Sequence, residues 1–331
     1  VMGKMDIAER RLPQDGRASI RVGDGDVDVR ISTVPVAGGE RVVFRILDKT
    51  TKVYSLDQIG LSDDQHRTIS RYINYSHGVI FVTGPTGSGK TTTLYACLDA
   101  INAPDLNILT IEDPVEYNLD GISQVQVNTK KGLTFAAGLR SFLRQDPDVM
   151  MVGEVRDNET ADIAIRAALT GHLVFSTVHT NDSASTISRL IDIGVEPYLV
   201  SSSLLLVIAQ RLLRTICPNC REPVEPDQKQ RYFLEDLKLT QDQFPGGKIF
   251  VGKGCDECFR SGFSGRTAIY EVMPIDPVVQ EQIIEKATAS QIKRGALERG
   301  LRTLRMNGVD KLLAGLTTPD EVLRVTQLDV L

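Results

Sequence analysis

Short apolar runs that alternate with helical stretches dominate the middle of the chain. Four of these runs are almost wholly apolar and lie at residues 79–83, 107–111, 149–152 and 173–177. Continuous apolar strands between helices predict a parallel sheet that is buried on both faces, and hence an α/β fold. Ligands of such sheets bind beyond the carboxyl ends of the strands. We therefore expect the functional residues to follow these runs.

The start of the chain has a different pattern, in which apolar and polar positions alternate. This alternation covers residues 18–22, 27–32 and 41–47, with Gly-Asp and Gly-Gly turns between them. Such a pattern predicts short strands of a small β-rich domain. We expect residues 1–48 to form the C-terminal part of that domain, and residues 49–60 to form a linker.

The chain changes character twice after the predicted core, which we place at residues 61–210. Cysteine, proline and glycine gather over residues 211–267, where we expect a separate module. Helical periodicity returns in the last part, residues 268–331. There Thr318-Pro319-Asp320-Glu321 has the residues of a helix start, with Thr as the N-cap and Glu placed for a capping box.

Composition and charge narrow the possible functions. The chain has 331 residues, enough for two or three domains, and a formal net charge of −5. Proteins that bind nucleic acid along its phosphates usually have a basic domain, so no direct nucleic-acid partner is expected. No run of 18 or more apolar residues is present, so we expect no transmembrane segment and a cytoplasmic location.

The apolar run at residues 79–83 leads directly into a phosphate-binding motif. Gly84-Pro85-Thr86-Gly87-Ser88-Gly89-Lys90-Thr91 matches G-x-x-x-x-G-K-[ST] in full, between a predicted strand and a predicted helix. The backbone N–H groups of such a loop surround phosphates, and the helix N-terminus adds partial positive charge. We expect Lys90 to reach the β- and γ-phosphates and Thr91 to hold Mg²⁺, with Thr92 beside them. The sequence has no Asn-Lys-x-Asp motif for guanine, which favours ATP.

Acidic residues follow two of the other runs. Residues 107–111 lead into Glu112-Asp113-Pro114-Val115-Glu116, and residues 149–152 lead into Gly153-Glu154. Hydrolysis needs one group to orient or deprotonate the attacking water and another to help hold Mg²⁺. Glu112 and Asp113 are candidates for structural or supporting roles. Because Gly153 stands where an Asp is usual, we expect Glu154 to act on Mg²⁺ through water.

Histidines and arginines complete the set of candidates. His172 precedes the run at residues 173–177 and His179 follows it. A histidine at the C-terminal end of a strand can sense the γ-phosphate or serve as a hydrogen-bonded structural residue, and the sequence leaves both possibilities open. Arginines often neutralise the charge of the transition state from a neighbouring subunit. The candidates are Arg17, Arg21, Arg30, Arg45, Arg140, Arg144 and Arg156.

Two C-x-x-C pairs predict a metal site. Cys217-Pro218-Asn219-Cys220 and Cys255-Asp256-Glu257-Cys258 are separated by 34 residues. Four thiolates suit a tetrahedral structural Zn²⁺, and redox-active pairs are the alternative. The separation exceeds the usual 15–20 residues, so we expect a small subdomain between the pairs. Cys97, on the helix after the phosphate loop, is expected to be a buried thiol.

Taken together, the motifs resemble those of the bacterial secretion ATPase superfamily. The resemblance rests on the phosphate loop, the cysteine pairs and four further segments: Leu12 to Arg17, Thr110 to Tyr117, Leu143 to Asp157, and Thr170 to Asn181. It implies a RecA-like P-loop NTPase core, a small preceding α+β domain of PAS-like fold and a homo-hexameric ring.

The resemblance also implies roles for individual residues. Glu116 resembles the catalytic base and Glu154 the Walker B carboxylate. Arg30 and Arg45 resemble the arginines that the small domain presents to nucleotide. His172 and His179 belong to the histidine box, in which His179 contacts the nucleotide, and Arg156 supports the site.

The cysteine module narrows the resemblance to type II secretion ATPases and pilus-extension ATPases. The segments 120–124 and 201–205 favour the former. The implied function is hydrolysis of ATP to drive assembly of a pseudopilus for protein export. The ring would be recruited to the cytoplasmic face of the inner membrane by secretion or pilus platform proteins. Assembly of type IV pili is the alternative, a DNA-translocating or conjugation-type ATPase is more distant, and a nucleotide-gated scaffold is a fourth possibility.

Overall fold

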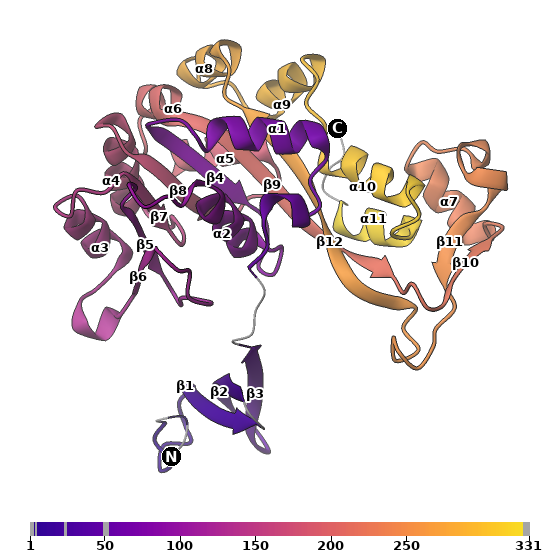
Figure 1. Ribbon diagram of the computed structural model, residues 1–331, viewed down its shortest axis with the longest axis horizontal. Coiled ribbons are helices and arrows are strands. Elements are labelled where there is room, and N and C mark those ends of the chain that lie inside the picture. Colours follow the sequence, from indigo (N-terminus) through magenta and orange to yellow (C-terminus); the bar gives the residue numbers. More distant parts are fainter. Residues whose placement is uncertain (1–2, 4, 23–24, 49–52, 327–331) are drawn as a thin grey trace. The chain divides into compact units, whose positions relative to one another are not determined.

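The computed structural model describes residues 3, 5–22, 25–48 and 53–326 and contains two compact units (Figure 1). One unit comprises Val1–Val53 with Glu116–Asn118, and the other comprises Tyr54–Val115 with Leu119–Leu331. The predicted linker at residues 49–60 lies partly outside the described residues. Its later part contains a single 3₁₀ turn, η1 (Leu56–Gln58).

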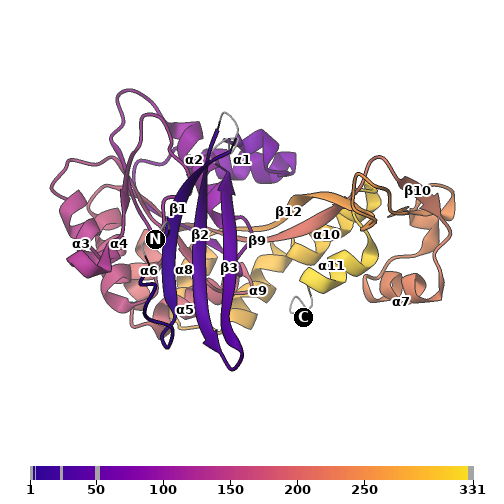
Figure 2. The ribbon, with the colours of Figure 1, turned by 90° about the horizontal axis from the view of Figure 1, so that it is seen from below.

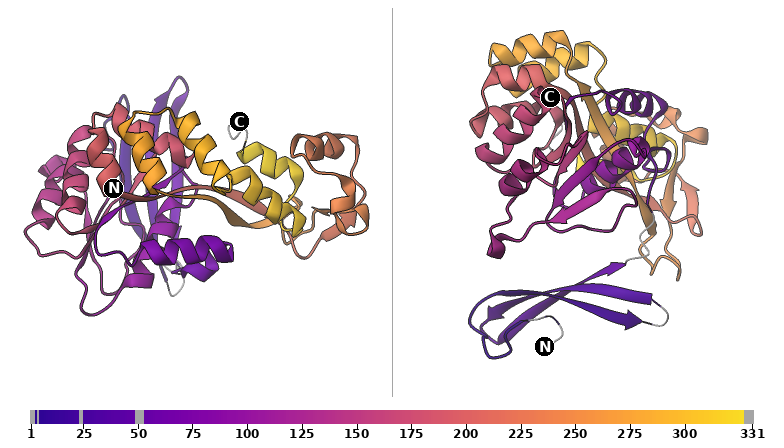
Figure 3. Two further views of the ribbon diagram at one scale, coloured as in Figure 1. Left: turned by 90° about the horizontal axis from the view of Figure 1, so that it is seen from above. Right: turned by 60° about the vertical axis from the view of Figure 1, so that its left-hand side comes forward.

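The first unit contains an antiparallel sheet of three strands in the order β1-β2-β3 (Figure 3, right). Its strands are β1 (Gln14–Val22), β2 (Gly25–Val36) and β3 (Gly39–Asp48). Ala18, Val29 and Ile31 form a small buried cluster on one face of this sheet. The three alternating segments of the sequence are therefore strands, as predicted.

The second unit is built on a sheet of seven strands in the order β12-β9-β4-β8-β7-β5-β6. All neighbours are parallel except β12 and β9, which are antiparallel. The four predicted apolar strands are β4, β5, β7 and β8, so the predicted α/β class with a parallel sheet is confirmed. The strands are β4 (Gly78–Thr83), β5 (Ile108–Glu112), β6 (Ser123–Gln126), β7 (Val149–Val152), β8 (Leu173–Val178), β9 (Leu204–Ile216) and β12 (Phe263–Pro274).

Helices cover both faces of this sheet, with α1 and α2 on one side and α5, α6, α8 and α9 on the other (Figure 3, left). Residues 268–331, predicted to be helical, begin with the second half of β12 and continue as four helices, α8 to α11. Apart from one helix between the two cysteine pairs, the α-helices described in this unit are α1 (Asp63–Tyr72), α2 (Lys90–Ile101), α3 (Phe135–Phe142), α4 (Asn158–Leu169), α5 (Ser183–Asp192), α6 (Pro197–Ser203), α8 (Pro277–Ile284), α9 (Ala289–Glu298), α10 (Leu304–Leu313) and α11 (Pro319–Val325).

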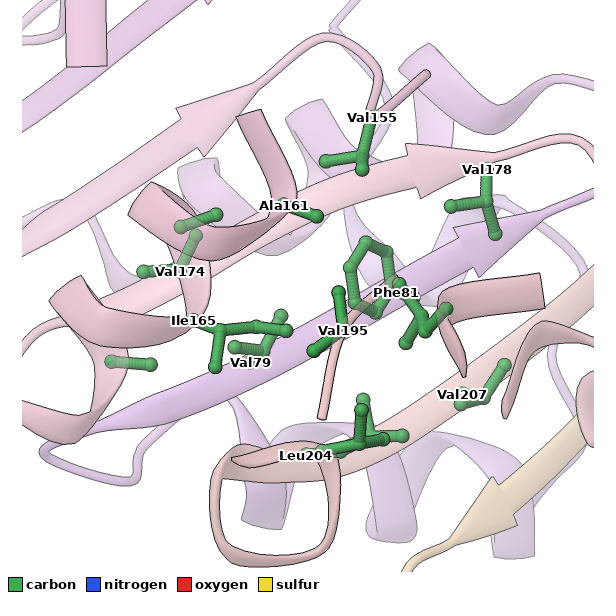
Figure 4. Close-up of a cluster of buried hydrophobic side chains, with 14 of the residues drawn as sticks. Val79, Phe81, Val155, Ala161, Ile165, Val174, Val178, Val195, Leu204 and Val207 are labelled. Carbon is green, nitrogen blue, oxygen red and sulfur yellow. The ribbon is translucent and has the colours of Figure 1, made fainter. Parts of the chain in front are cut away.

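The main core lies between the sheet and the helices α3, α4, α5, α6, α8 and α9, and Figure 4 shows the part of it around α4. Val79 and Phe81 of β4 meet Val174 and Val178 of β8, and Ile165 of α4 packs over them. Every residue of β4 and β8 is buried, because helices cover both faces. This explains why the sequence of these strands is apolar without alternation.

The strands β9 and β12 extend beyond the sheet as a long antiparallel arm that carries the cysteine module (Figures 1 and 2). The module contains α7 (Gln228–Asp236) and a two-stranded sheet of β10 (Arg221–Val224) and β11 (Ile249–Gly252). Leu234, Leu237 and Ile249 share a core with residues of α10 and α11. The segment between the two cysteine pairs thus contains a helix and a two-stranded sheet and belongs to the same compact unit as the seven-stranded sheet. No helix among the described residues has the length and apolarity that crossing a membrane requires.

The predicted capping box of α11 is wrong. Thr318 is the N-cap and Pro319 begins the helix, but the Thr318 side chain makes no capping hydrogen bond. The fully buried Glu321 carboxylate instead accepts from the backbone N–H of Arg214, at 3.2 Å, and forms ion pairs with the side chains of Arg214 and Arg324. A buried carboxylate needs cationic partners, so Glu321 joins α11 to β9 rather than closing its own helix.

Candidate nucleotide site and metal centre

The phosphate loop follows β4, which lies between β9 and β8 in the sheet. Gly84, Gly87 and Gly89 have φ angles of 150°, 79° and 88°, a region that side chains disfavour. A Cβ atom on Gly84 would lie 2.5 Å from the carbonyl oxygen of Gln210, so only glycine fits there. Because α2 begins at Lys90, its unpaired N–H groups face the loop. The backbone is thus shaped to surround an anion.

The polar side chains of the loop are compatible with a phosphate ligand. Lys90 Nζ donates hydrogen bonds to the carbonyl oxygens of Gly84, at 2.8 Å, and Pro85, at 3.2 Å. The Ser88 hydroxyl is buried and has no hydrogen-bond partner in the described part of the chain. A buried unpaired hydroxyl costs free energy, and an incoming oxyanion would satisfy it. Pro85, Thr86 and Gly87 form the exposed rim of the loop.

Glu154 and His179 meet beside this loop. The carboxylate follows β7, the imidazole follows β8, and His179 Nε2 lies 3.4 Å from Glu154 Oε2. Arg156 also forms an ion pair with Glu154, whose side chain is only 13% exposed. Burial lowers the pKa of Lys90, whereas the charge of Glu154 raises it, which places the carboxylate in the electrostatic field of the loop. The structure therefore places Arg156 and His179 in contact with Glu154, close enough to Lys90 for the charges to interact, and the catalytic roles of these residues stay predictions.

Threonine hydroxyls hold the ends of these strands together. Thr83, the last residue of β4, shares a 2.7 Å hydrogen bond with the Thr180 hydroxyl and accepts from the Thr180 backbone N–H at 2.8 Å. Thr177 donates at 2.6 Å to the carbonyl oxygen of Gly153. These bonds fasten the loops that carry Glu154 and His179. Thr91–Thr92 lie half-buried in the first turn of α2.

Glu112 has a structural environment. Its carboxylate is 3% exposed and accepts hydrogen bonds from Tyr95, from Thr110 at 2.6 Å and from Gln124 at 3.2 Å. These donors come from α2, β5 and β6, so the carboxylate ties one helix to the edge of the sheet. Asp113, the next residue, is exposed.

His172 is separated from the phosphate loop. Its Nδ1 lies 2.8 Å from the carbonyl oxygen of Ala167, and its own carbonyl accepts from the N–H of Gly78. His172 therefore lies where β4 and β8 begin, whereas the loop and His179 lie where they end. The strands β4 and β8 have six residues each. At about 3.3 Å per residue, the beginnings and the ends of these strands are about 20 Å apart.

The arginines of the small unit form a row. Arg17 is opposite Arg30 in the pairing of β1 with β2, and Arg30 is opposite Arg45 in the pairing of β2 with β3. Residues directly opposite share a face of the sheet, where like charges repel. Such a row would be stabilised by an anion. Glu116 also belongs to this unit, and the roles of Glu116, Arg30 and Arg45 stay predictions.

Two other candidate arginines have partners of their own. Arg140 forms an ion pair with Glu159 and so joins α3 to α4. Arg144 donates at 2.8 Å to the carbonyl oxygen of Arg140.

Two residues of the site escaped the sequence analysis, namely Gln210 and Arg211 of β9. Gln210 Oε1 accepts from the Thr93 hydroxyl of α2 at 2.8 Å, and a Cβ atom on Gly89 would lie 2.8 Å from Gln210 Nε2. Arg211 is 8% exposed and lies against Gly84. Both residues follow the apolar run 204–209, and β9 continues past them to Ile216.

The four cysteines of the module form one cluster. Their sulfur atoms all lie within 4.8 Å of one another, with pairs at 3.7, 3.8 and 3.9 Å. A tetrahedral zinc ion with Zn–S bonds of about 2.3 Å requires sulfur atoms about 3.8 Å apart. Backbone N–H groups of Gly254 and Gly262 point at the sulfur atoms of Cys220 and Cys258, both at 3.3 Å. The donor set thus fits a metal ion that prefers thiolates.

The geometry of the first site defines a class of protein. A glycine-rich loop between a central parallel strand and a helix, with a carboxylate at a nearby strand end, is typical of P-loop nucleotide-binding proteins. The family follows from the comparison of sequences. The chain belongs to the type II/IV secretion system protein family, whose model matches residues 1–324. The family expected from the motifs is therefore confirmed.

Individual relatives agree with this assignment. The chain is 52% identical over 329 residues to type II secretion system protein E of Aeromonas hydrophila, which covers 99% of this chain and 64% of that protein. It is 48% identical over 330 residues to the type IV pilus assembly ATPase PilB of Myxococcus xanthus, with 99% and 58% covered. The chain thus spans less than two thirds of the length of these relatives.

A solved structure supports the fold. The pilus retraction motor PilT with bound ADP has a TM-score of 0.68 and 27% identity, and the match covers 95% of this chain and 77% of that chain.

Proposed function

We propose that this chain is the ATP-hydrolysing part of a motor that drives pseudopilus assembly for protein export by a type II secretion system. The observation that carries the proposal is the group of Lys90, Glu154 and His179 at the phosphate loop of a member of the secretion family. The identity of 52% to a type II secretion protein favours secretion as the process served.

The residues of the site would divide the work of hydrolysis. The backbone of the loop and Lys90 hold the β- and γ-phosphates, and Glu116 takes a proton from the attacking water. The new bond forms between this water oxygen and the γ-phosphorus as the bond to the β,γ-bridging oxygen breaks, which yields ADP and phosphate. His179 and Arg156 keep the Glu154 carboxylate in place.

Positive charge stabilises the transition state of this reaction. Thr91 and Glu154 would hold Mg²⁺, which neutralises charge that develops on the phosphate oxygens. Arg30 and Arg45 would add further positive charge, as the resemblance to secretion ATPases implies. Their opposed positions across two strands support this role, because they place two positive charges next to each other on the sheet.

The cysteine cluster would hold a structural Zn²⁺. All four ligands are thiols, so no coordination position is left for a reacting water. The metal would join the two ends of the module, where Cys217 and Cys220 follow β9 and Cys255 and Cys258 precede β12. The expected role is to hold the module together at the tip of the arm.

The proposed assembly is a homo-hexameric ring recruited to the cytoplasmic face of the inner membrane by platform proteins of the secretion system. Conformational changes on ATP binding and hydrolysis would be transmitted through the ring to the platform. Assembly of type IV pili is a second candidate, because the chain is 48% identical to a pilus assembly ATPase over 99% of its length.

The first experiment measures steady-state ATPase activity over a series of protein concentrations. Wild-type protein is compared with Glu116→Gln, with Lys90→Ala as the control for nucleotide binding, and zinc is measured in the same samples. We expect the specific ATPase activity of the wild type to rise steeply with protein concentration and to be at least about 100-fold lower in both variants. We expect about one zinc per chain in all samples. Unchanged activity in Glu116→Gln would show that another residue is the base. Stimulation by DNA would instead favour a DNA-translocating motor.

A second experiment separates secretion from pilus assembly. The gene for the full-length protein is deleted in its host, and secreted enzymes and surface pili are measured in the same cells. Loss of secretion with normal pili supports the proposal. Loss of pili with normal secretion would assign the protein to pilus assembly.

A further inference from the structure

Arg211 occupies a position that neither the phosphate-loop motif nor the histidine box includes. In the parallel pairing of β4 with β9, Thr83 is opposite Ala209, so Gln210 and Arg211 continue beside the phosphate loop after β4 has ended. A Cβ atom on Gly84 would lie 3.1 Å from Arg211 Nη1. The guanidinium group is therefore packed against the first residue of the loop.

The same group reaches the loop that carries the histidine. Arg211 Nη1 donates to the carbonyl oxygen of Gln210 at 2.9 Å. Nη2 donates to the backbone oxygen of Asn181 at 2.8 Å and lies 3.4 Å from its side-chain oxygen. Asn181 comes two residues after His179, which contacts Glu154. Arg211 thus spans from β9 to the loop that carries His179.

The Arg211 guanidinium group is buried, so its position depends on the hydrogen bonds that it makes. Arg211 is 8% exposed, and a buried cation stays in place only where hydrogen bonds replace its hydration. The charge of Arg211 also lowers the pKa of Lys90, in addition to the larger effect of burial, so the two cations lie close enough to interact. A lysine in this position would have the charge but not the planar, forked set of donors.

We propose that Arg211 is a positioning residue for ATP hydrolysis. Its guanidinium group holds the segment 179–182 next to Gly84 of the phosphate loop, and this keeps His179 in contact with Glu154. This inference rests on the proposed ATPase function. Arg211 acts through other residues and does not itself take part in the reaction.

The test compares Arg211→Gln and Arg211→Lys with wild-type protein in the presence of Mg²⁺. We expect Arg211→Gln to lower kcat about 10- to 100-fold, because small displacements of catalytic groups have effects of this size. The dissociation constant of a fluorescent ATP analogue should change less than about 3-fold, which is below 1 kcal/mol. Arg211→Lys should lie between. Arg67→Gln, on the exposed face of α1 in an ion pair with Asp64, is the control and should keep wild-type kinetics.

A double-mutant cycle shows whether Arg211 acts through His179. If it does, Arg211→Gln should slow the His179→Gln variant much less than it slows the wild type. Independent effects that multiply would overturn the proposal. A loss of nucleotide affinity without a loss of kcat would also overturn it, because Arg211 would then be a phosphate ligand.

Hydrogen exchange provides a readout that does not depend on activity. Amides of residues 179–186 should exchange faster in Arg211→Gln and Arg211→Lys than in wild type, while those of β7 keep their protection. Unchanged exchange in the segment would refute the positioning role even if the protein hydrolyses no ATP. An inactive wild type with the expected exchange would instead count against the proposed function alone.

Discussion

At the scale of single residues, buried carboxylates show how acidic side chains near a catalytic site can have different tasks. Glu112 is the last residue of β5, four residues before Glu116, and the sequence made it a candidate for a structural or supporting role. Three hydrogen-bond donors and 3% exposure make Glu112 a structural link between α2, β5 and β6. Its contribution to activity is then indirect.

This environment predicts the effect of removing Glu112. Glu112→Ala would leave the hydroxyls of Tyr95 and Thr110 and the amide of Gln124 without a main acceptor. The free energy of unfolding should fall by about 2–4 kcal/mol, as measured by urea denaturation followed by circular dichroism. Thr110→Val, which removes one donor, should cost about 1 kcal/mol. If Glu112→Ala were as stable as wild type but had lost ATP hydrolysis, Glu112 would be a catalytic residue.

Glu321 leads to a prediction about pH. Burial raises the pKa of Glu321, but hydrogen bonds from Arg324 and Arg214 outweigh this effect and hold the pKa at about 2, against an ordinary value of 4.5. A group whose pKa is lower in the folded state stabilises the protein above its unfolded pKa. This stabilisation is therefore complete above about pH 5 and is lost as the pH falls from 4.5 toward 2.

The expected loss can be measured by urea unfolding between pH 7 and pH 4. The difference in unfolding free energy between wild type and Glu321→Gln should be constant from pH 7 to pH 5 and smaller by about 1 kcal/mol at pH 4. Arg302→Gln, whose ion pair with Asp310 is half-exposed, serves as the control with little effect. A difference that grows as the pH falls would contradict the role assigned to Glu321.

At the scale of elements, the sequence was most informative where helices bury both faces of a strand. The runs that became β4, β5, β7 and β8 are almost wholly apolar, and the segments that follow three of them contain Lys90, Glu154 and His179. The core cluster explains this success, since local composition there reflects burial on both sides.

The arm formed by β9 and β12 was not predicted from the sequence. The sequence divided residues 204–216 between the predicted core and the predicted module, because their pairing with residues 263–274, which begin 47 residues after β9 ends, is not visible in the local sequence. Gln210 and Arg211 escaped notice for this reason. His172 is the converse case: its motif pointed to the nucleotide, but its position at the start of β8 keeps it at the opposite edge. Tertiary pairing, rather than local propensity, decides both cases.

The cysteine module is the element whose stability should depend on metal. Removal of zinc with a strong chelator should increase hydrogen exchange in residues 217–262 and leave the seven-stranded sheet protected, because the module has its own cluster of ligands. Iodoacetamide should then modify four of the five thiols. Cys97 should stay unmodified, since it is fully buried and burial raises its pKa to about 12.

Two variants make this prediction sharper. Cys217→Ser should abolish stoichiometric zinc binding, whereas Cys97→Ala should keep about one zinc per chain. Four reactive thiols before chelation, with no zinc in the purified protein, would show that the cluster is a redox centre or a free tetrathiol instead.

At the scale of the whole molecule, the residues proposed for ATP hydrolysis are divided between the two units. The second unit contains the phosphate loop and Glu154, and the first contains the opposed arginines and Glu116. In a ring, arginines can act on a nucleotide held by their own chain or by the next chain. Mixing of inactive variants distinguishes these possibilities, because a mixed ring can rebuild a complete site only across two subunits.

The mixing experiment uses Lys90→Ala, which retains Arg45, and Arg45→Ala, which retains the phosphate loop. If Arg45 acts on a nucleotide of the neighbouring subunit, equal mixing before assembly should restore roughly a quarter of wild-type activity, since half of the sites keep the loop and half of those meet an intact arginine. A mixture of Lys90→Ala with Glu154→Gln is the control and should stay inactive, because both groups belong to the same loop site of one chain. If the Arg45 mixture also stays inactive although mixed rings form, Arg45 serves the nucleotide of its own chain. Each subunit of the ring would then have a complete catalytic site of its own.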